Sequence, residues 1–170
     1  TGKTINNNKT ENINWYSANM YRVGIDIPAG DYYAVTEDNY GGYYCKYNDS
    51  TQSDIEDNGI FDTFTFFRCY EGQYLKLSRC KITPITNAPI YSTDNGIYEE
   101  GTYRVGIDMP EGEYKFIATD KELDGYYCAY TDITYNHIES NDNFENTVYY
   151  TVKNGQYLRL NRCTAVCINE

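Results

Sequence analysis

Tyr21-Arg22-Val23-Gly24-Ile25-Asp26-Ile27-Pro28-Ala29-Gly30-Asp31-Tyr32 is repeated later in the chain as Tyr103-Arg104-Val105-Gly106-Ile107-Asp108-Met109-Pro110-Glu111-Gly112-Glu113-Tyr114. Nine of these twelve positions are identical, at a sequence offset of 82. Two further blocks return at an offset of 83: Gly42–Tyr47 as Gly125–Tyr130, and Gly72–Cys80 as Gly155–Cys163. The duplication predicts two homologous domains of about 80 residues each.

The residues between these blocks divide the chain into four parts. We expect a polar tether at residues 1–14, a first repeat at 15–85, a linker at 86–96 and a second repeat at 97–170. The tether contains Asn6-Asn7-Asn8 and shows no hydrophobic period. Trp15-Tyr16 and Ile97-Tyr98 occupy equivalent positions, so each repeat is expected to begin there with an edge strand.

Within each repeat the pattern is typical of strands throughout. Leu75 and Leu77 alternate with Tyr74 and Lys76, which indicates one buried face, and no long window has a helical period. Pro28-Ala29-Gly30 predicts a hairpin turn between the runs on either side of it. The predicted fold class is all-β: two tandem, homologous antiparallel β-sandwich domains of jelly-roll-like type.

Composition excludes several classes of partner. The formal net charge is −11, which disfavours nucleic acid and anionic membranes because both are bound by basic surfaces. No apolar run approaches the roughly 20 residues of a transmembrane helix. The 21 tyrosines are the compositional outlier, and tyrosine suits a half-buried strand surface.

Four of the six cysteines are shared between the repeats: Cys45 matches Cys128, and Cys80 matches Cys163. The economical hypothesis is two equivalent disulfides, Cys45–Cys80 and Cys128–Cys163, each closing a loop of about 35 residues and stabilising by roughly 3–4 kcal/mol. The alternative is buried free thiols. Cys69 and Cys167 are not shared; they either bridge the domains or remain a core thiol and a tail thiol.

The motif Tyr-x-Val-Gly-x-Asp-Ile-Pro-x-Gly-x-Tyr, followed by a strand with Cys-x-Tyr and a last strand ending in Cys, resembles a small all-β domain. That domain is repeated in predicted secreted proteins and lipoproteins of Gram-positive bacteria, and Gly101-Thr102 reproduces its usual opening. The resemblance covers roughly residues 15–85 and 97–168. It implies the fold, paired cysteines and an extracellular or cell-surface location with an N-terminal tether, and it implies no assigned activity. Tyr47 and Tyr130 stand where relatives often carry Trp, and the usual Cys-Gly-x-Trp ending is absent.

Catalysis and metal binding receive little support from the residues. The single histidine, His137, has Asp54 as its counterpart, and no nucleophile motif surrounds it. Asp26 and Asp108 are weak calcium candidates, together with Asp31 or Glu113. The favoured interpretation is that Asp26 and Asp108 bond backbone amides of the adjoining turn. We therefore expect no enzyme activity, no cofactor and no metal.

The shared tyrosines are the best candidates for a binding site. If Cys45 and Cys128 face the core, strand alternation leaves Tyr44 and Tyr127 exposed. Exposed tyrosines with neighbouring Asp and Asn can stack on a sugar ring and bond its hydroxyls, and two copies give avidity. The sequence thus predicts a non-catalytic module that binds glycan or cell-wall polymer. The alternative is a structural spacer or protein-interaction module whose tyrosines are ordinary strand surface.

Overall fold

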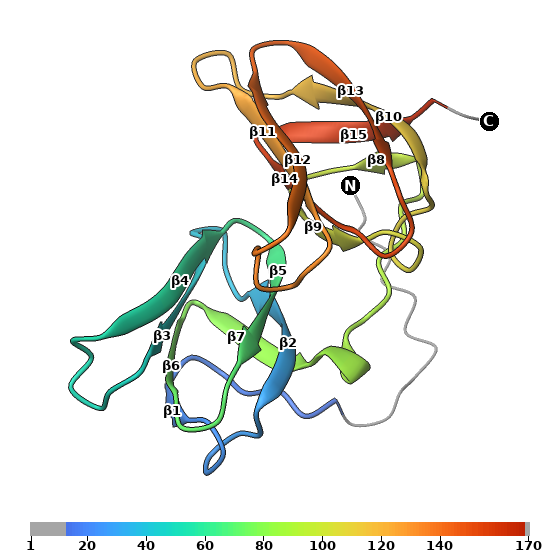
Figure 1. Cartoon of the computed structure of the whole chain (residues 1–170). Helices are drawn as coiled ribbons and strands as arrows, with labels where there is room; N and C mark the ends of the chain where they lie inside the picture. The colour runs from blue at the N-terminus through green and yellow to red at the C-terminus, as the bar shows by residue number, and fades with distance from the viewer. Residues whose placement is uncertain (1–12, 169–170) are drawn as a thin grey trace. The chain divides into compact units, whose positions relative to one another are not determined.

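The computed structural model describes residues 13–168, and these form two compact units, residues 13–88 and 89–168 (Figure 1). Most of the predicted tether, residues 1–12, lies outside the described residues. Each unit holds one repeat, and its elements are antiparallel strands arranged as two facing sheets. The predicted fold class, two tandem β-sandwich domains, is confirmed.

The described part of repeat 1 contains seven strands. They are β1 (Met20–Arg22), β2 (Gly30–Thr36), β3 (Gly42–Tyr47), β4 (Ile55–Phe61), β5 (Phe64–Cys69), β6 (Tyr74–Ser78) and β7 (Cys80–Pro84). A four-stranded sheet has the order β1-β6-β3-β4, and a three-stranded sheet has the order β5-β2-β7. A short 3-10 helix, Ile85–Asn87, follows β7.

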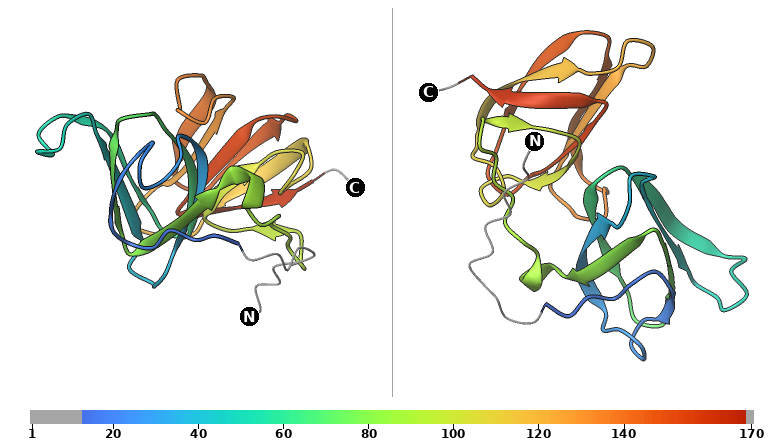
Figure 2. Two further views of the ribbon diagram at one scale, coloured as in Figure 1. Left: turned by 90° about the horizontal axis from the view of Figure 1, so that it is seen from below. Right: turned by 180° about the vertical axis from the view of Figure 1, so that it is seen from behind.

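Repeat 2 has the same plan with one more strand. Its strands are β8 (Ile97–Tyr98), β9 (Gly101–Arg104), β10 (Gly112–Ala118), β11 (Gly125–Tyr130), β12 (Ile138–Phe144), β13 (Thr147–Val152), β14 (Tyr157–Asn161) and β15 (Cys163–Cys167). The sheet orders are β9-β14-β11-β12 and β8-β15-β10-β13. Figure 2 shows these strands, coloured yellow-green to red, from two further sides. β8 pairs with β15, so the edge strand predicted at Ile97-Tyr98 is confirmed. At the matching place in repeat 1, Tyr16 makes only an isolated bridge to Ile82, and no strand forms there.

The core of each repeat is aromatic and aliphatic and lies between its two sheets. In repeat 1 it includes Tyr32, Tyr44, Phe67, Leu75 and Ile82, each at most 4% exposed. The Tyr44 and Phe67 rings stack with centroids 4.2 Å apart, which joins the two sheets directly. Burying such rings supplies most of the favourable free energy of a domain this small.

The Pro-x-Gly segment connects the two sheets, and the predicted hairpin at Pro28-Ala29-Gly30 is wrong. β1 ends at Arg22 and pairs with β6, whereas β2 begins at Gly30 in the opposite sheet. A tight turn at Gly24, with φ of 91°, ends β1 through a hydrogen bond from the Gly24 amide to the Ile27 carbonyl. The turn therefore leads the chain across the sandwich. Among residues 13–168, no helix is long and apolar enough to cross a membrane.

Candidate binding face

Strand β3 sets which tyrosines face the core, and the prediction that Tyr44 is exposed is wrong. Tyr44 is 4% exposed and lies in the core cluster with Leu75 and Phe67. Its hydroxyl donates a hydrogen bond to Asp57 Oδ2 at 3.2 Å. Alternation along the strand consequently sends Tyr43, Cys45 and Tyr47 to the outward face.

Tyr127 in repeat 2 repeats this placement, so its predicted exposure is wrong too. It is 4% exposed, packs on Phe116 with ring centroids 4.7 Å apart, and its hydroxyl lies 2.8 Å from Ser140 Oγ. The premise that failed was the direction of the cysteine. The sequence-based prediction assumes that a buried cysteine lies on the core side, but neighbouring side chains bury Cys45 and Cys128 on the outer side of the sheet.

The same alternation explains why the predicted disulfides Cys45–Cys80 and Cys128–Cys163 are not formed. All six cysteines are free thiols in the structure. Cys80 belongs to the core cluster, whereas Cys45 projects from the opposite side of its sheet. The Cys80 thiol donates to the Tyr43 carbonyl at 3.5 Å, and the Cys163 thiol donates to the Tyr126 carbonyl at 3.3 Å. Cys80 of β7 thus lies between the two sheets, and Cys45 of β3 lies on the outer side of the four-stranded sheet. That sheet separates the two thiols, so they cannot meet the geometry of a disulfide.

We define the outward face of the four-stranded sheet in each repeat as its tyrosine face. Strand pairing places Tyr47 opposite Tyr74, Cys45 opposite Lys76 on one side, and Cys45 opposite Asn58 on the other. Repeat 2 places Tyr130 opposite Tyr157, and Cys128 opposite both Arg159 and Asn141. Each tyrosine face thus has a thiol at its centre, flanked by tyrosines, an asparagine and a cation.

The tyrosine face is preserved between the repeats, whereas the outward face of the other sheet is not. On the tyrosine face, six of ten equivalent pairs are identical: Met20/Thr102, Arg22/Arg104, Tyr43/Tyr126, Cys45/Cys128, Tyr47/Tyr130, Asn58/Asn141, Ile60/Asn143, Tyr74/Tyr157, Lys76/Arg159 and Ser78/Asn161. On the other face none of eight is identical: Asp31/Glu113, Tyr33/Lys115, Val35/Ile117, Phe64/Thr147, Phe66/Tyr149, Arg68/Thr151, Lys81/Thr164 and Thr83/Val166. Both faces point away from the core between the sheets, although Cys45, Tyr47, Cys128 and Tyr130 are themselves buried on the tyrosine face, at 0%, 7%, 2% and 0% exposed.

Hydrogen bonds and ring contacts organise the tyrosine face. The Tyr43 hydroxyl bonds with the Cys45 thiol, and this bond, with burial, raises the pKa of Tyr43 to about 12. In repeat 2 burial, followed by the bond to Cys128, raises the pKa of Tyr126. Both phenols are therefore neutral near pH 7.

The two copies differ at one end of the face. Tyr130 and Tyr157 stack with centroids 5.4 Å apart and an interplanar angle of 10°, and Tyr135 covers Tyr130 at 4.2 Å. Gln52 holds the matching position in repeat 1, and both Gln52 and Tyr135 have φ of 62°. The backbone is thus shared, while the covering ring belongs to repeat 2.

A charged cluster distinguishes the inner side of repeat 1. Lys46 is 4% exposed, and its ammonium lies 2.9 Å from Asp57 Oδ2 while donating to the Arg68 carbonyl at 2.9 Å. The Arg68 side chain itself lies on the outward face of the other sheet, where Asp31 binds it through two hydrogen bonds of 2.6 and 3.0 Å. Repeat 2 replaces Lys46 by Ala129 and Asp57 by Ser140. The cluster is therefore local to repeat 1 and does not belong to a shared site.

The calcium candidates Asp26 and Asp108 accept hydrogen bonds from backbone amides of their turns, as the favoured interpretation predicted. Asp26 Oδ2 accepts the Arg22 amide at 2.7 Å, and Asp108 Oδ2 accepts the Arg104 amide at 2.9 Å. Across residues 13–168, no group of three or more His, Cys, Asp and Glu side chains is placed to hold a metal ion. His137 is exposed, with its Nδ1 3.8 Å from Asp132 Oδ2.

Sequence reasoning missed Tyr74, Tyr157, Lys76, Arg159, Asn58 and Asn141 as members of a shared face. Their signal was present in the repeated block Gly-Gln-Tyr-Leu-Lys/Arg-Leu, where the two leucines mark the buried side. The tyrosine before the first leucine and the basic residue between the two leucines must therefore face outward. The second copy keeps the tyrosine and a basic residue at these positions. In comparisons with known proteins, no family model, no curated protein and no solved structure matches this chain.

Proposed function

We propose that the chain is a non-catalytic, extracellular recognition module that binds glycan or cell-wall polymer across the tyrosine face of each repeat. The observation that carries the proposal is the preservation of this face beside the divergence of the other outward face. Two copies that need only a common core are free to vary outside it. Retention of an outward surface in both favours a shared ligand.

The chemistry of the face suits a sugar polymer. Tyr43, Tyr74, Tyr126 and Tyr157 are half-buried, so each ring is fixed by packing and keeps part of its surface open. Rigid aromatic rings with a polar tip are efficient contact groups because little side-chain entropy is lost on binding. Asn58 and Asn141 are exposed beside them and both donate and accept hydrogen bonds, as sugar hydroxyls require.

The cation on each face adds a second donor group. Lys76 and Arg159 lie across the ladder from the central thiol, where an N–H can reach an oxygen of a bound ring. The local cations stand within a chain of net charge −11, which disfavours binding to polyanions by charge alone. A neutral, hydroxyl-rich polymer therefore fits better than a polyanion. Occupation of both faces by one polymer would add avidity.

The test is depletion of the full chain from solution by a panel of insoluble polysaccharides and bacterial cell walls. We expect depletion by at least one material, and its loss in Tyr74→Ala/Tyr157→Ala. Each single variant should retain weakened binding, because one face remains. The control is Tyr149→Ala, which removes a tyrosine that is 54% exposed on the other, divergent face of repeat 2.

The outcome separates the proposal from the spacer or protein-interaction alternative. Depletion lost in the double variant and kept in Tyr149→Ala supports the tyrosine faces. Depletion that survives the double variant, or no depletion by any material, contradicts them. Tyr44 and Tyr127 are unsuitable for this test, because truncating a buried aromatic ring costs about 3–5 kcal/mol of stability.

A further inference from the structure

One motif shared by both repeats is covered in repeat 2 and open in repeat 1. We call it the cradle: Tyr98, Tyr103, Arg104 and Asp108 in repeat 2, and Tyr16, Tyr21, Arg22 and Asp26 in repeat 1. The repeat 2 members are 7%, 0%, 9% and 5% exposed. Of the repeat 1 members, Tyr16 and Tyr21 are half-buried, and Arg22 and Asp26 are exposed.

An extended segment of the linker, Pro89 to Tyr91, fills the cradle of repeat 2. The Arg104 guanidinium donates to the Pro89 carbonyl at 2.9 Å, and the Tyr91 amide donates to Asp108 Oδ1 at 2.9 Å. The Tyr91 ring meets Tyr103 edge-on with centroids 5.0 Å apart. Arg104 and Asp108 thus form hydrogen bonds with linker backbone groups two residues apart. The aromatic ring of the linker packs against Tyr103.

Hydrogen bonds within the Arg–Asp pair of repeat 2 orient both side chains toward the linker backbone. Arg104 binds Asp108 through hydrogen bonds of 2.7 and 2.8 Å. The pair presents a donor and an acceptor side by side, the complement of a peptide backbone in extended conformation. Because both charges are buried with their partners, the linker completes a satisfied network.

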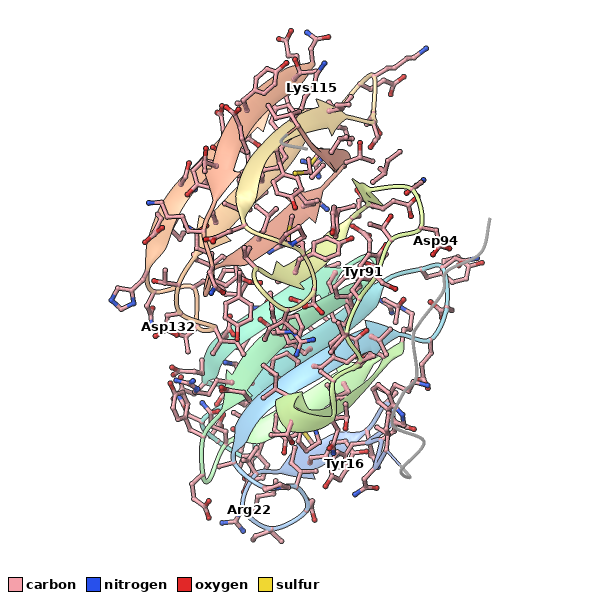
Figure 3. All side chains as sticks on the ribbon, turned by 90° about the vertical axis from the view of Figure 1, so that its right-hand side faces the viewer. Tyr16, Arg22, Tyr91, Asp94, Lys115 and Asp132 are labelled. Carbon is pink, nitrogen blue, oxygen red and sulfur yellow. The ribbon has the colours of Figure 1, made fainter. Side chains whose placement is uncertain are left out.

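The cradle of repeat 1 has the same framework. The Arg22 amide donates to Asp26 Oδ2 at 2.7 Å, and the Asp26 amide donates to the Arg22 carbonyl at 2.8 Å, matching 2.9 and 2.8 Å in repeat 2. Tyr16 and Tyr21 meet edge-on at 5.8 Å, as Tyr98 and Tyr103 do at 5.3 Å. The main difference is Arg22, which is labelled in Figure 3. Its guanidinium lies 5.8 Å from the centre of the Tyr74 ring.

We infer that the cradle of repeat 1 binds an extended segment of a partner polypeptide that carries an aromatic residue two positions after a proline. The bound linker of repeat 2 is the template: a carbonyl for Arg22, an amide for Asp26 and a ring against Tyr21. Binding requires Arg22 to leave Tyr74 and join Asp26, as Arg104 joins Asp108. Residues 7–9, the counterparts of Pro89–Tyr91, lie outside the described residues and are Asn, Asn and Lys, which offer no aromatic ring.

The test uses the full chain, labelled with nitrogen-15, and the acetylated and amidated peptide Ala-Pro-Ile-Tyr-Ser-Thr, which copies residues 88–93. We expect saturable NMR shifts at the amides of Tyr21, Arg22 and Asp26, with one site per chain because the other cradle is filled. Arg22→Ala, which removes an exposed side chain and keeps the backbone bonds, should weaken binding about tenfold or more, or about 1.4 kcal/mol. Arg79→Ala is the control for loss of an exposed arginine elsewhere.

A second pair of peptides tests the contacts themselves. Methylation of the tyrosine nitrogen removes the proton that Asp26 would accept, and tyrosine to alanine removes the ring; each should weaken binding about tenfold or more. The inference is overturned by an absence of saturable shifts, by shifts at the Arg104 and Asp108 amides alone, or by binding indifferent to Arg22→Ala and to N-methylation. Arg22 contacts Tyr74, so Arg22→Ala also touches the tyrosine face of repeat 1, whereas Tyr157 of repeat 2 takes no part in the peptide test and polymer binding through it is judged separately.

Discussion

At the scale of single residues, burial has opposite meanings for Cys45 and Cys80. Both are fully buried, yet one lies beneath outward-facing tyrosines and the other lies in the core. Sequence alternation relates a residue to its neighbours but gives no absolute direction. The direction came from the two leucines of β6, which pair with Lys46 and Tyr44 and are both buried.

Cys69 gives a pH dependence of stability. Burial raises the pKa of the Cys69 thiol from its ordinary value of 9.0 to about 12, so the thiol is neutral in the folded state over the whole physiological range. Below the pKa of the thiol in the unfolded chain, both states keep the proton and the folded state has its full stability. As pH rises from about 9 toward 12, only the unfolded state loses the proton, so the free energy of unfolding declines.

We therefore expect the urea midpoint of unfolding to fall between pH 8 and pH 10.5. Cys69→Val introduces the residue type that repeat 2 has at the equivalent position, Val152. It should make the decrease of the urea midpoint smaller, because one thiol no longer titrates in the unfolded state. Cys167→Ser provides the comparison for a half-exposed thiol. Identical pH profiles for the wild type and Cys69→Val would contradict the burial of this thiol.

At the scale of elements, the β3–β4 ladder of repeat 1 contains a charged pair that repeat 2 lacks. Lys46 and Asp57 are directly opposed in this ladder, and Ala129 and Ser140 occupy the same register in repeat 2. The Lys46 side chain is 5% exposed, while that of Asp57 is 43% exposed, so water screens one end of the pair. Fold formation itself does not need the pair, because repeat 2 forms the same ladder without it.

We expect Asp57→Ala to destabilise repeat 1 by about 2 kcal/mol, less than the full cost for a wholly buried pair, because it strands a buried ammonium. Lys46→Met/Asp57→Ser should recover most of that loss, since it removes the charge together with its partner. Urea denaturation measures both. A double variant as unstable as Asp57→Ala alone would show that lost packing, and not the stranded charge, sets the cost.

At the scale of the whole molecule, the absence of disulfides among residues 13–168 leads to a prediction about the cysteines of both repeats. We expect all six cysteines to react with a thiol reagent in denaturant without any reductant, because none is paired in the structure. In the folded chain Cys167, which is only half-buried, should react first, and the five buried thiols should follow on unfolding. Recovery of only two thiols in denaturant, those of Cys69 and Cys167, would restore the two predicted disulfides.

The two surfaces argued for this chain rest on the duplication in different ways. The tyrosine face is inferred from what both copies keep, and the cradle from a shared motif that one copy leaves open. Depletion by polymers tests the first, and peptide titration tests the second. A chain with both would bind a polymer through two equivalent faces and one polypeptide through repeat 1.

The sequence by itself determined that there are two all-β repeats and that Asp26 and Asp108 accept hydrogen bonds from backbone amides of their turns. These follow from local pattern: period-two alternation, turn residues and an internal offset are all recorded along the chain. The fold class therefore needed no contact between distant residues.

Only the tertiary structure decided which way Tyr44, Tyr127 and the paired cysteines face, that the Pro-x-Gly turn crosses between sheets, and that Pro89 and Tyr91 fill a cradle. Each depends on which strands become neighbours, and a local pattern is compatible with several pairings. Pairing β1 with β6 placed Arg22 beside Tyr74, and the linker's return over β9 buried Arg104. Non-local contacts of this kind set the direction of every outward side chain, and they create the candidate surfaces.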